Sequence, residues 1–171
     1  MRERRTARVL LLDPEGRILL MRGRLPGDPA APSVWFTVGG GMEPGESVVE
    51  AAAREIVEET GLTDARLGPI VWTSEAMLHD RKRRPVHFRE SYVVAYTAGG
   101  DLSRAGWQPL EREFVDDVRW WTLGELQLTG EPVYPEGLAA LLPEVLAGRF
   151  AAEPLVIRTL DGPVSPAPKA P

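Results

Sequence analysis

Three glutamates and an arginine lie within six positions of one short segment. The stretch GGGMEPGESVVEAAAREIVEETGL, residues 39–62, contains Arg54, Glu55, Glu58 and Glu59 behind three consecutive glycines. At about 100° per residue, the three glutamates share a helical arc of about 100° and point the same way. Like charges at this spacing destabilise an exposed helix by roughly a few tenths of a kcal/mol per pair. A cation bound on the arc would remove that repulsion.

Carboxylate oxygens are the ligands that hard divalent cations prefer. We expect Mg²⁺ where the partner is a phosphate, because this ion keeps some water ligands and shares the oxygens of the substrate, and Mn²⁺ is its substitute. The chain has no cysteine, which excludes a zinc–thiolate site, an iron–sulfur cluster and a thiolate nucleophile. Taken alone, the acids also fit a solvated surface helix that is stabilised by an Arg54–Glu58 pair and by its cap.

A helix must position these side chains. Ser47 and Glu50 have the spacing of a capping box, and Gly61 is placed to end the helix, so the pattern predicts a helix over Val48 to Thr60. Arg54 can brace a carboxylate in this helix through a bidentate contact. The expected apolar flank, which would pack under a sheet, consists of Val49, Ala53, Ile56, Val57 and Thr60.

The spacing of the whole segment is more specific than the three acids. It has Gly40, five residues, Glu46, seven residues, Arg54, Glu55, aliphatic Ile56, any residue, Glu58, Glu59, any residue, Gly61 and aliphatic Leu62. This pattern resembles the signature box of the Nudix hydrolase family at every constrained position. The one departure is Val38, where relatives commonly have proline.

The resemblance implies a fold and an activity. The fold would be of the α/β or α+β class, with a mixed β-sheet between helices. The activity would be that of a pyrophosphohydrolase, which cleaves a diphosphate linkage in a nucleoside diphosphate linked to another moiety by means of metal-activated water. A catalytically silent nucleotide-binding or regulatory Nudix module is the alternative, although such modules usually lose box acids. The isoprenoid isomerase branch of the family relies on a cysteine, which this chain lacks.

The resemblance also implies roles for individual residues. The metal ligands would be Glu55, Glu58 and Glu59, one of them also the base, with a backbone carbonyl near Gly39 or Gly40. Arg54 would belong to the same catalytic arrangement, and Glu46, in the loop before the helix, would support that arrangement or Arg54.

Outside the box, the candidates rest on weaker signals. A further acid from a later loop often completes such a site, and Glu111 or Glu113 could supply it. Arg22, Arg24 and Arg89 are candidates for binding substrate phosphate. The basic run at 81–84 could catch a polyphosphate, but a basic hairpin tip is more often simply solvated. Among the aromatic residues, Trp35, Trp72 and Trp107 could stack on a base, with core packing or loop anchoring as the favoured role of each.

The rest of the chain reads as strands with a few helices. Residues 6–24 predict a β-hairpin around a turn at Asp13 to Gly16, and residues 34–36 a short apolar piece. A second hairpin is predicted from 66–78 and 85–98, then a loop over 99–113, a strand at 115–122 and helical turns at 123–128. Leucines at helical spacing over 135–150 predict a packing helix that Pro143 could interrupt.

Composition limits the remaining possibilities. With 171 residues, the chain fits one domain, residues 1–160, followed by a mobile Pro-rich tail over 161–171. The formal net charge of −5 argues against a nucleic-acid polymer as partner but is compatible with a small anionic substrate. The resemblance implies that this substrate is a small nucleotide derivative. No apolar run is long enough for a membrane helix or a signal segment, so we expect no membrane partner and a cytoplasmic location.

Two questions stay open at this stage. Relatives that prefer ADP-ribose or dinucleoside polyphosphates often have Pro or Tyr some 15 to 18 residues past the box, and Leu78, His79 and Asp80 provide neither. The identity of the nucleotide is therefore undetermined. Homodimers are common among relatives, and the sequence does not decide the oligomeric state.

Overall fold

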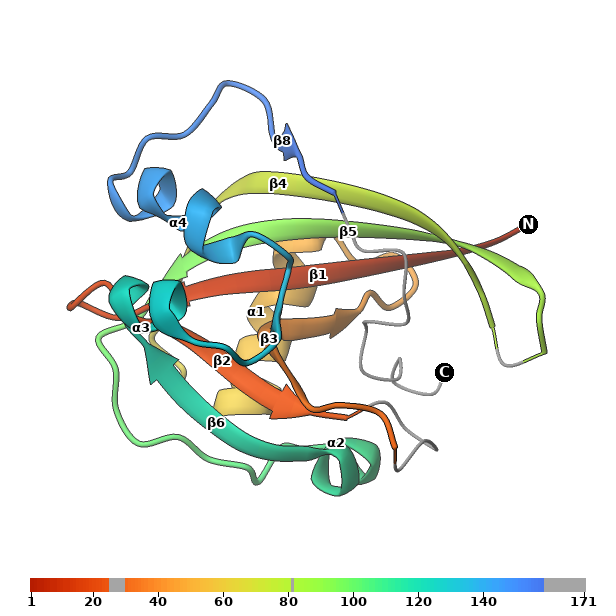
Figure 1. The fold of residues 1–171 in the computed structure, drawn as a ribbon, viewed down its shortest axis with the longest axis horizontal. Coiled ribbons are helices and arrows are strands. Elements are labelled where there is room, and N and C mark those ends of the chain that lie inside the picture. The colour runs from red at the N-terminus through yellow and green to blue at the C-terminus, as the bar shows by residue number, and fades with distance from the viewer. Residues whose placement is uncertain (25–29, 81, 159–171) are drawn as a thin grey trace.

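A computed structural model describes residues 1–24, 30–80 and 82–158 of the chain. These described residues form eight strands and four helices (Figure 1). The strands are β1 (Arg2–Leu12), β2 (Ile18–Gly23), β3 (Val34–Gly41), β4 (Arg66–His79), β5 (Pro85–Tyr96), β6 (Val115–Trp121), β7 (Val133–Tyr134) and β8 (Leu155–Val156). The helices are α1 (Val48–Thr60), α2 (Pro109–Phe114), α3 (Leu123–Leu128) and α4 (Leu138–Leu146).

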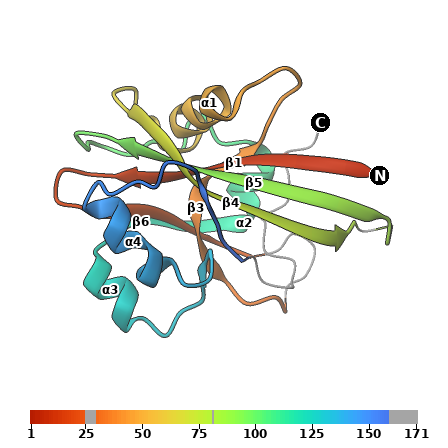
Figure 2. The same cartoon turned by 90° about the horizontal axis from the view of Figure 1, so that it is seen from above.

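The strands form one mixed sheet, as predicted. Its order is β6-β2-β3-β1-β5-β4-β8, with β7 added in parallel to β3. The central pair β1–β5 is parallel, and β1–β3, β2–β3 and β4–β5 are antiparallel. Helix α1 covers one face of the sheet, and α3 and α4 cover the other (Figure 2). The predicted arrangement of a sheet between helices is confirmed.

The predicted first hairpin is only partly right. The turn is present, with the Gly16 N–H bonded to the Asp13 carbonyl and the Arg17 N–H bonded to the Asp13 carboxylate. However, β1 pairs with β2 only at Leu12 and Ile18. Beyond that point β3 lies between them and pairs with both strands. Both strands have apolar residues on their two faces, as is typical of strands in the interior of a sheet. When they diverge, β3 pairs with the backbone N–H and C=O groups on the edges of β1 and β2 that face each other.

Strand β3 is longer than the short apolar piece that the sequence predicted. It runs through all three glycines, and Gly39 to Gly41 pair with β1. Gly39 has φ 139°, and a Cβ there would collide with the Ala7 carbonyl of β1. The glycines therefore let β3 continue beside β1 up to the start of the acidic segment.

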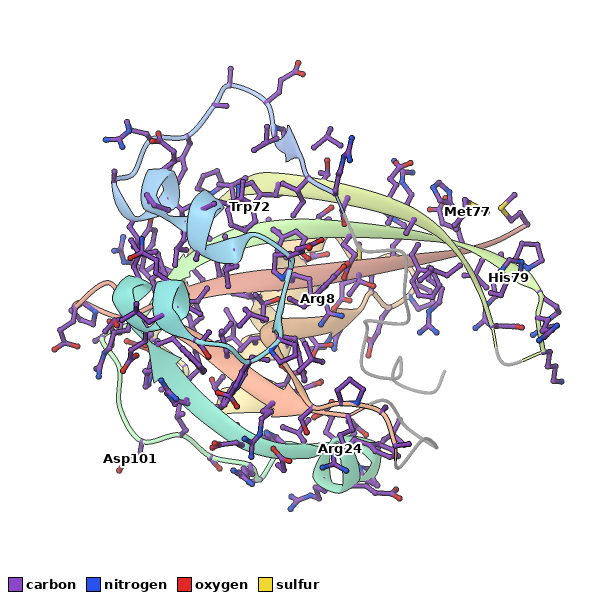
Figure 3. All side chains as sticks on the ribbon, in the orientation of Figure 1. Arg8, Arg24, Trp72, Met77, His79 and Asp101 are labelled. Carbon is purple, nitrogen blue, oxygen red and sulfur yellow. The ribbon has the colours of Figure 1, made fainter. Side chains whose placement is uncertain are left out.

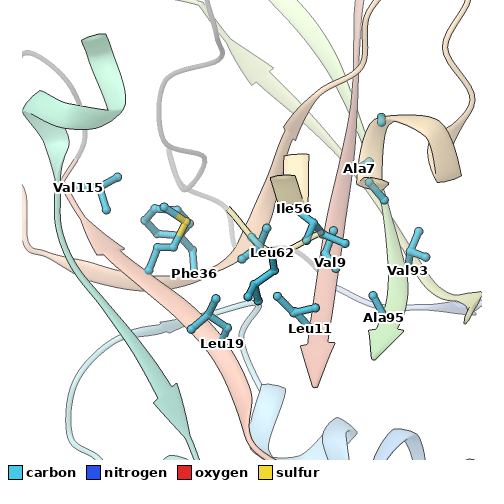
Figure 4. Packing of buried hydrophobic residues seen from close by; sticks show 14 of the residues in the cluster. Ala7, Val9, Leu11, Leu19, Phe36, Ile56, Leu62, Val93, Ala95 and Val115 are labelled. Atoms are coloured by element: carbon cyan, nitrogen blue, oxygen red, sulfur yellow. The ribbon is translucent and has the colours of Figure 1, made fainter. Parts of the chain in front are cut away.

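Side-chain alternation divides the core into two layers. Ala7, Val9 and Leu11 of β1 pack toward α1, together with Ile56 and Leu62 (Figure 4). Leu10 and Leu12 face the opposite layer, with α3 and α4. This second layer contains Trp35 and Trp72, whereas Trp107 belongs to the first; all three are buried, as the packing role predicted.

The C-terminal half differs from the sequence prediction at two points. The predicted loop over 99–113 contains the start of α2, where Pro109 takes the first helical position and Gln108 the N-cap. Helix α4 begins at Leu138, after a cis Tyr134–Pro135 bond, and continues through Pro143. No helix in the described residues is long and apolar enough to cross a membrane. The predicted tail, 161–171, lies outside the described residues.

Candidate functional site

Helix α1 has the predicted ends. The Ser47 side chain accepts from the Glu50 N–H at 3.1 Å, and Glu50 in turn accepts from the Ser47 N–H at 2.8 Å. Gly61 ends the helix in the left-handed conformation, with φ 75°. Local hydrogen bonds therefore determine where α1 begins and ends. They do not determine which side of the helix faces the sheet, which depends on what the helix packs against.

The buried face of α1 agrees with the predicted apolar flank only in part: Ile56 and Thr60 are buried as expected, and Ala53 is partly buried. Val49 and Val57 are exposed, at 42% and 48%, whereas Glu55 and Glu59 are buried, at 0% and 5%. The reason is that Ala51 and Ala52, which are small and fully buried, let this face approach the glycine end of β3. Two of the three acids consequently face the sheet, and only Glu58 is partly open, its side chain 27% exposed.

Arg54 links the box acids. Its Nε and Nη2 donate to the two oxygens of Glu46 at 2.7 and 2.8 Å, so the expected bidentate contact is present, but with the loop before α1 and not with an acid of the helix. Its Nη1 donates to Glu55 Oε1 at 2.9 Å and lies 3.5 Å from Glu58 Oε2. Its Nη2 also reaches the Gly41 carbonyl at 3.1 Å. The hydrogen bond with Glu46 is the main cause that raises the pKa of Arg54, so the guanidinium stays charged at any ordinary pH.

The glycines of β3 accommodate the two buried acids. A Cβ at Gly40 would lie 2.6 Å from Glu55 Oε1, so a side chain at this position would displace the carboxylate. The Gly39 N–H donates to Glu59 Oε2 at 3.0 Å. Both carboxylates therefore lie directly against the backbone of β3, which explains why glycines precede the acidic helix.

The loop before α2 holds the other end of α1. The indole Nε1 of Trp107 donates to the Glu59 carbonyl at 2.7 Å, and a Cβ at Gly106 would lie 2.7 Å from the Glu58 carbonyl. These contacts fix the backbone that carries Glu58 and Glu59. The sequence indicated an anchoring role for Trp107, but not its partner.

The site is suited to a cation. Glu55 and Glu58 direct oxygens at the same nitrogen of Arg54, so the two carboxylates converge on a common position. All donors are hard oxygens, which suit Mg²⁺ or Mn²⁺. Within the described ranges, no group of three or more His, Asp or Glu side chains is arranged to hold a metal ion. In this arrangement Arg54 donates to Glu55 and the Gly39 N–H donates to Glu59. These hydrogen bonds use carboxylate oxygens that a bound metal would otherwise contact.

The three predicted substrate arginines do not gather at the acids. Arg22 lies on the sheet face away from α1, where it contacts Asp116 at 2.8 Å and stacks over the Trp35 ring. Arg24 donates to Ser33 at 3.1 Å and lies near the end of α2 (Figure 3). Only Arg89 is on the α1 face of the sheet, and it donates to Glu75 at 3.0 Å.

The predicted downstream acids both belong to α2. Glu111 caps this helix through the Gln108 N–H, and Glu113 is exposed. Helix α2 begins two residues after Trp107, which contacts the end of α1. Neither acid forms a metal-binding group with the box acids in the described part of the chain.

One buried polar cluster was missed by sequence reasoning. Arg8 is 1% exposed, donates to Glu90 at 2.9 Å and extends toward the Gly39 carbonyl at 3.5 Å. The Tyr134 hydroxyl donates to Glu90 at 2.6 Å. Burial opposes the charge on Arg8, but the attraction of Glu90 outweighs it and raises the pKa of the guanidinium. The available signal was an arginine that directly adjoins the apolar run at residues 9–12 of β1.

Comparison with known proteins agrees with this fold. The family model described as NUDIX domain matches residues 2–141, and the chain therefore belongs to the Nudix hydrolase family. It is a hydrolase of diphosphate linkages, in keeping with its pyrophosphohydrolase relatives.

The individual relatives share between a quarter and a third of the aligned residues with this chain. An RNA pyrophosphohydrolase of Caulobacter vibrioides is 31% identical over 134 residues, which cover 74% of each chain. An oxidized purine nucleoside triphosphate hydrolase of Danio rerio is 32% identical over 122 residues, covering 67% of this chain and 75% of that protein. The solution structure of the E. coli ORF135 protein superimposes with a TM-score of 0.55 at 25% identity, covering 87% of this chain and 92% of that one.

Proposed function

We propose that the protein cleaves the phosphoanhydride of a small nucleotide derivative with Mg²⁺, for which Mn²⁺ can substitute. The observation that carries the proposal is the convergence of Glu55 and Glu58 on one Arg54 nitrogen, at 2.9 and 3.5 Å. This geometry already accommodates positive charge between two box acids. Two relatives support the substrate class, since their names describe hydrolysis of phosphoanhydrides on nucleotides or RNA.

The residues divide into ligands and supports. Glu55, Glu58 and Glu59 would hold the metal, together with the Gly40 carbonyl and, from α2, Glu113. A divalent cation, when bound, supplies positive charge to phosphoryl oxygens and acidifies water. Glu58 is the best candidate for accepting the proton of the attacking water, because its side chain is the most exposed of the three acids.

Glu46 and Arg54 keep these acids in position. The bidentate pair between them is mostly shielded from water, with the Glu46 side chain 12% exposed. A bidentate contact restricts orientation more than a single hydrogen bond does. Arg89, on the α1 face of the sheet, is the best placed of the three predicted arginines to meet substrate phosphate.

Three further predictions from the sequence remain proposals. These are one domain over residues 1–160, a cytoplasmic location and a homodimer as one assembly. The rival function is a silent nucleotide-binding module. The presence of all the box acids argues against it, because a module that only binds has no need of them.

Product analysis with a defined panel tests the proposed function. The purified protein would be incubated with Mg²⁺ or Mn²⁺ and with ADP-ribose, diadenosine polyphosphates, NADH, sugar nucleotides, and ordinary and oxidised nucleoside triphosphates. We expect cleavage of at least one compound, and a rate lowered by orders of magnitude in Glu58→Gln. Binding of a nucleotide without any product would favour the silent module.

A further inference from the structure

Three strands extend beyond the helices as a projecting wing. It consists of residues 2–5 of β1, 75–79 of β4 and 85–89 of β5, with the connecting residues 80 and 82–84 (Figures 1 and 2). Parallel pairing joins Arg2–Val86 through Arg5–Arg89, and antiparallel pairing joins Glu75–Arg89 through His79–Pro85. Met77 and His79 mark the far part of this hairpin (Figure 3). We call these residues the basic wing.

The basic wing has a charge opposite to that of the whole chain. Without Arg81, it has seven Arg and Lys residues against three Asp and Glu residues, in a protein whose formal net charge is −5. No ion pair with a carboxylate is recorded in the described residues for Arg2, Arg4, Arg5, Lys82 and Arg83. The charges of the chain are therefore segregated, and a cationic surface stands out from an acidic body.

The basic wing begins at the acidic site. The Arg5 carbonyl accepts from the Met42 N–H at 2.9 Å, and its neighbour Thr6 pairs with Gly41. Arg5 and Ala7 are two residues apart in β1, so their side chains lie on the same face of the sheet. Ala7 packs toward α1. The exposed Arg5 side chain therefore lies on the α1 face. It is next to the part of β1 that pairs with the glycines of β3, which contact the box acids.

Two like charges lie side by side at this point. Arg5 and Arg89 are partners in the parallel pairing of β1 with β5, and both are exposed. Like charges on neighbouring strands repel. Among the described residues, carboxylates pair with Arg89, namely Glu75 at 3.0 Å and Glu3 at 3.9 Å, but not with Arg5. An anion bound between the two guanidinium groups would remove the repulsion.

The tip of the basic wing has a defined shape. Asp80 Oδ1 accepts from the Lys82 and Arg84 N–H groups, at 2.8 and 2.9 Å, while Asp80 Oδ2 pairs with the Arg84 guanidinium. Arg83 has φ 58°, a conformation that is unfavourable for a residue other than glycine. Lys82 and Arg83 are both exposed, so the described residues of the tip present two cations to the solvent.

We propose that the basic wing binds the phosphodiester backbone of a single-stranded RNA whose 5′ polyphosphate end enters the acidic site. The proposal rests on the proposed function, because it extends the substrate from a free nucleotide to a nucleotide at the end of a chain. From Arg89 to the tip, four residues of strand rise about 13 Å, which gives room for the nucleotides that follow the reacting end. Net charge argued against such a polymer, but counterion release depends on the cations in the contact surface.

Paired kinetics on two substrates tests the proposal. Hydrolysis of GTP would be compared with hydrolysis of a 5′-triphosphorylated single-stranded RNA of about eight nucleotides that begins with G. The test variant is Lys82→Glu/Arg83→Glu. The control is Arg66→Glu/Arg149→Glu, which changes the net charge equally at two exposed arginines outside the basic wing.

The expected result is selective for the polymer. The test variant should show a KM for RNA raised about tenfold or more, with its kinetics on GTP unchanged, and the control should resemble the parent protein on RNA. The slope of log KM against log salt for RNA should become shallower by about 1.4 when two phosphate contacts are lost. Equal effects on both substrates, or an unchanged KM for RNA, would overturn the proposal.

A binding measurement separates this proposal from the proposed function. If the parent protein cleaved neither these two substrates nor any compound of the panel, the proposed function would fail. Fluorescence anisotropy with the same RNA in EDTA would still test the basic wing. Weaker RNA binding by the test variant alone would support it. Unchanged RNA binding, together with lost binding to vesicles containing anionic lipid, would identify a membrane as the partner and refute the assignment to RNA.

Discussion

Replacing Gly40 by alanine should separate the stability of the fold from the function of its site. The new Cβ would lie 2.6 Å from Glu55 Oε1, 3.0 Å from its carboxyl carbon and 3.2 Å from its second oxygen. The Glu55 side chain is fully buried and accepts from Arg54 at 2.9 Å, so it has little room to move aside. The methyl group must displace the carboxylate from its present position.

The magnitude follows from these contacts. Overpacking of a well-packed interior costs about 1–3 kcal/mol, and a strained hydrogen bond to a charged partner can lose about 1.5–3 kcal/mol at most. The carboxylate either stays in place and is overpacked or moves and strains its hydrogen bond, so the two costs are not added. We therefore expect the free energy of unfolding to fall by about 1–3 kcal/mol. The hydrolysis rate should fall more than tenfold, because an ångström-scale shift of a catalytic group is enough for such a loss.

Gly41→Ala is the matched control. No atom lies within 4 Å of a Cβ built on Gly41, and its φ is outside the left-handed region. Its substitution should leave the rate unchanged and stabilise the fold slightly, by about 0.4–1 kcal/mol, through the lower entropy of the unfolded chain.

The assay combines urea denaturation with initial rates and with the affinity for Mn²⁺. Gly40→Ala should be folded under assay conditions, slow, and weak in binding Mn²⁺. The reasoning is refuted if Gly40→Ala retains the rate and Mn²⁺ affinity of Gly41→Ala, since the Glu55 carboxylate would then not need its present position.

Three further predictions concern other charged groups. Arg54→Lys should lower the rate at least tenfold with little loss of stability, because an ammonium cannot replace the bidentate contact with Glu46; a rate equal to that of the parent would contradict this role. Arg8→Met should reduce the free energy of unfolding in urea by about 3–5 kcal/mol, because it leaves Glu90 buried without its partner, and Arg8→Met/Glu90→Met should regain much of it. The pKa of Asp80 is lowered to about 2, first by the hydrogen bond from the Arg84 N–H. The stabilisation of the tip by this carboxylate should therefore be complete above about pH 4 and be lost as the pH falls toward 2. An NMR titration of the Asp80 carboxyl carbon should accordingly have its midpoint well below pH 3.8.

The local features of the site were readable from the chain. Ser47, Glu50 and Gly61 predicted the ends of α1 correctly, because capping depends on residues only three or four positions apart. The resemblance to the box implied that Glu46 supports either the acids or Arg54, and the structure shows the contact with Arg54. A periodic pattern could not determine which side of α1 faces the sheet. Counting apolar residues selected Val49 and Val57, whereas the glycines of β3 make the acidic side the one that approaches most closely.

The strand neighbours show the same division. The sequence indicated β-strands on both sides of the turn at Asp13, but not that β3 would lie between them or that β5 would run parallel to β1. Strand pairing between distant segments depends on shape and burial across the whole sheet, and no local pattern encodes it.

By itself, the sequence determined the family, the acidic helix with its caps and the oxygen ligands available to a metal, because these depend on residue types at short spacing. Only the tertiary structure decided that Glu55 and Glu59 are buried against β3, that Arg8 and Glu90 meet across the sheet, and that Arg5 and Arg89 lie side by side at the edge of the site. Those arrangements arise from packing between segments far apart in the chain, where burial and charge are set by neighbours that no single segment contains.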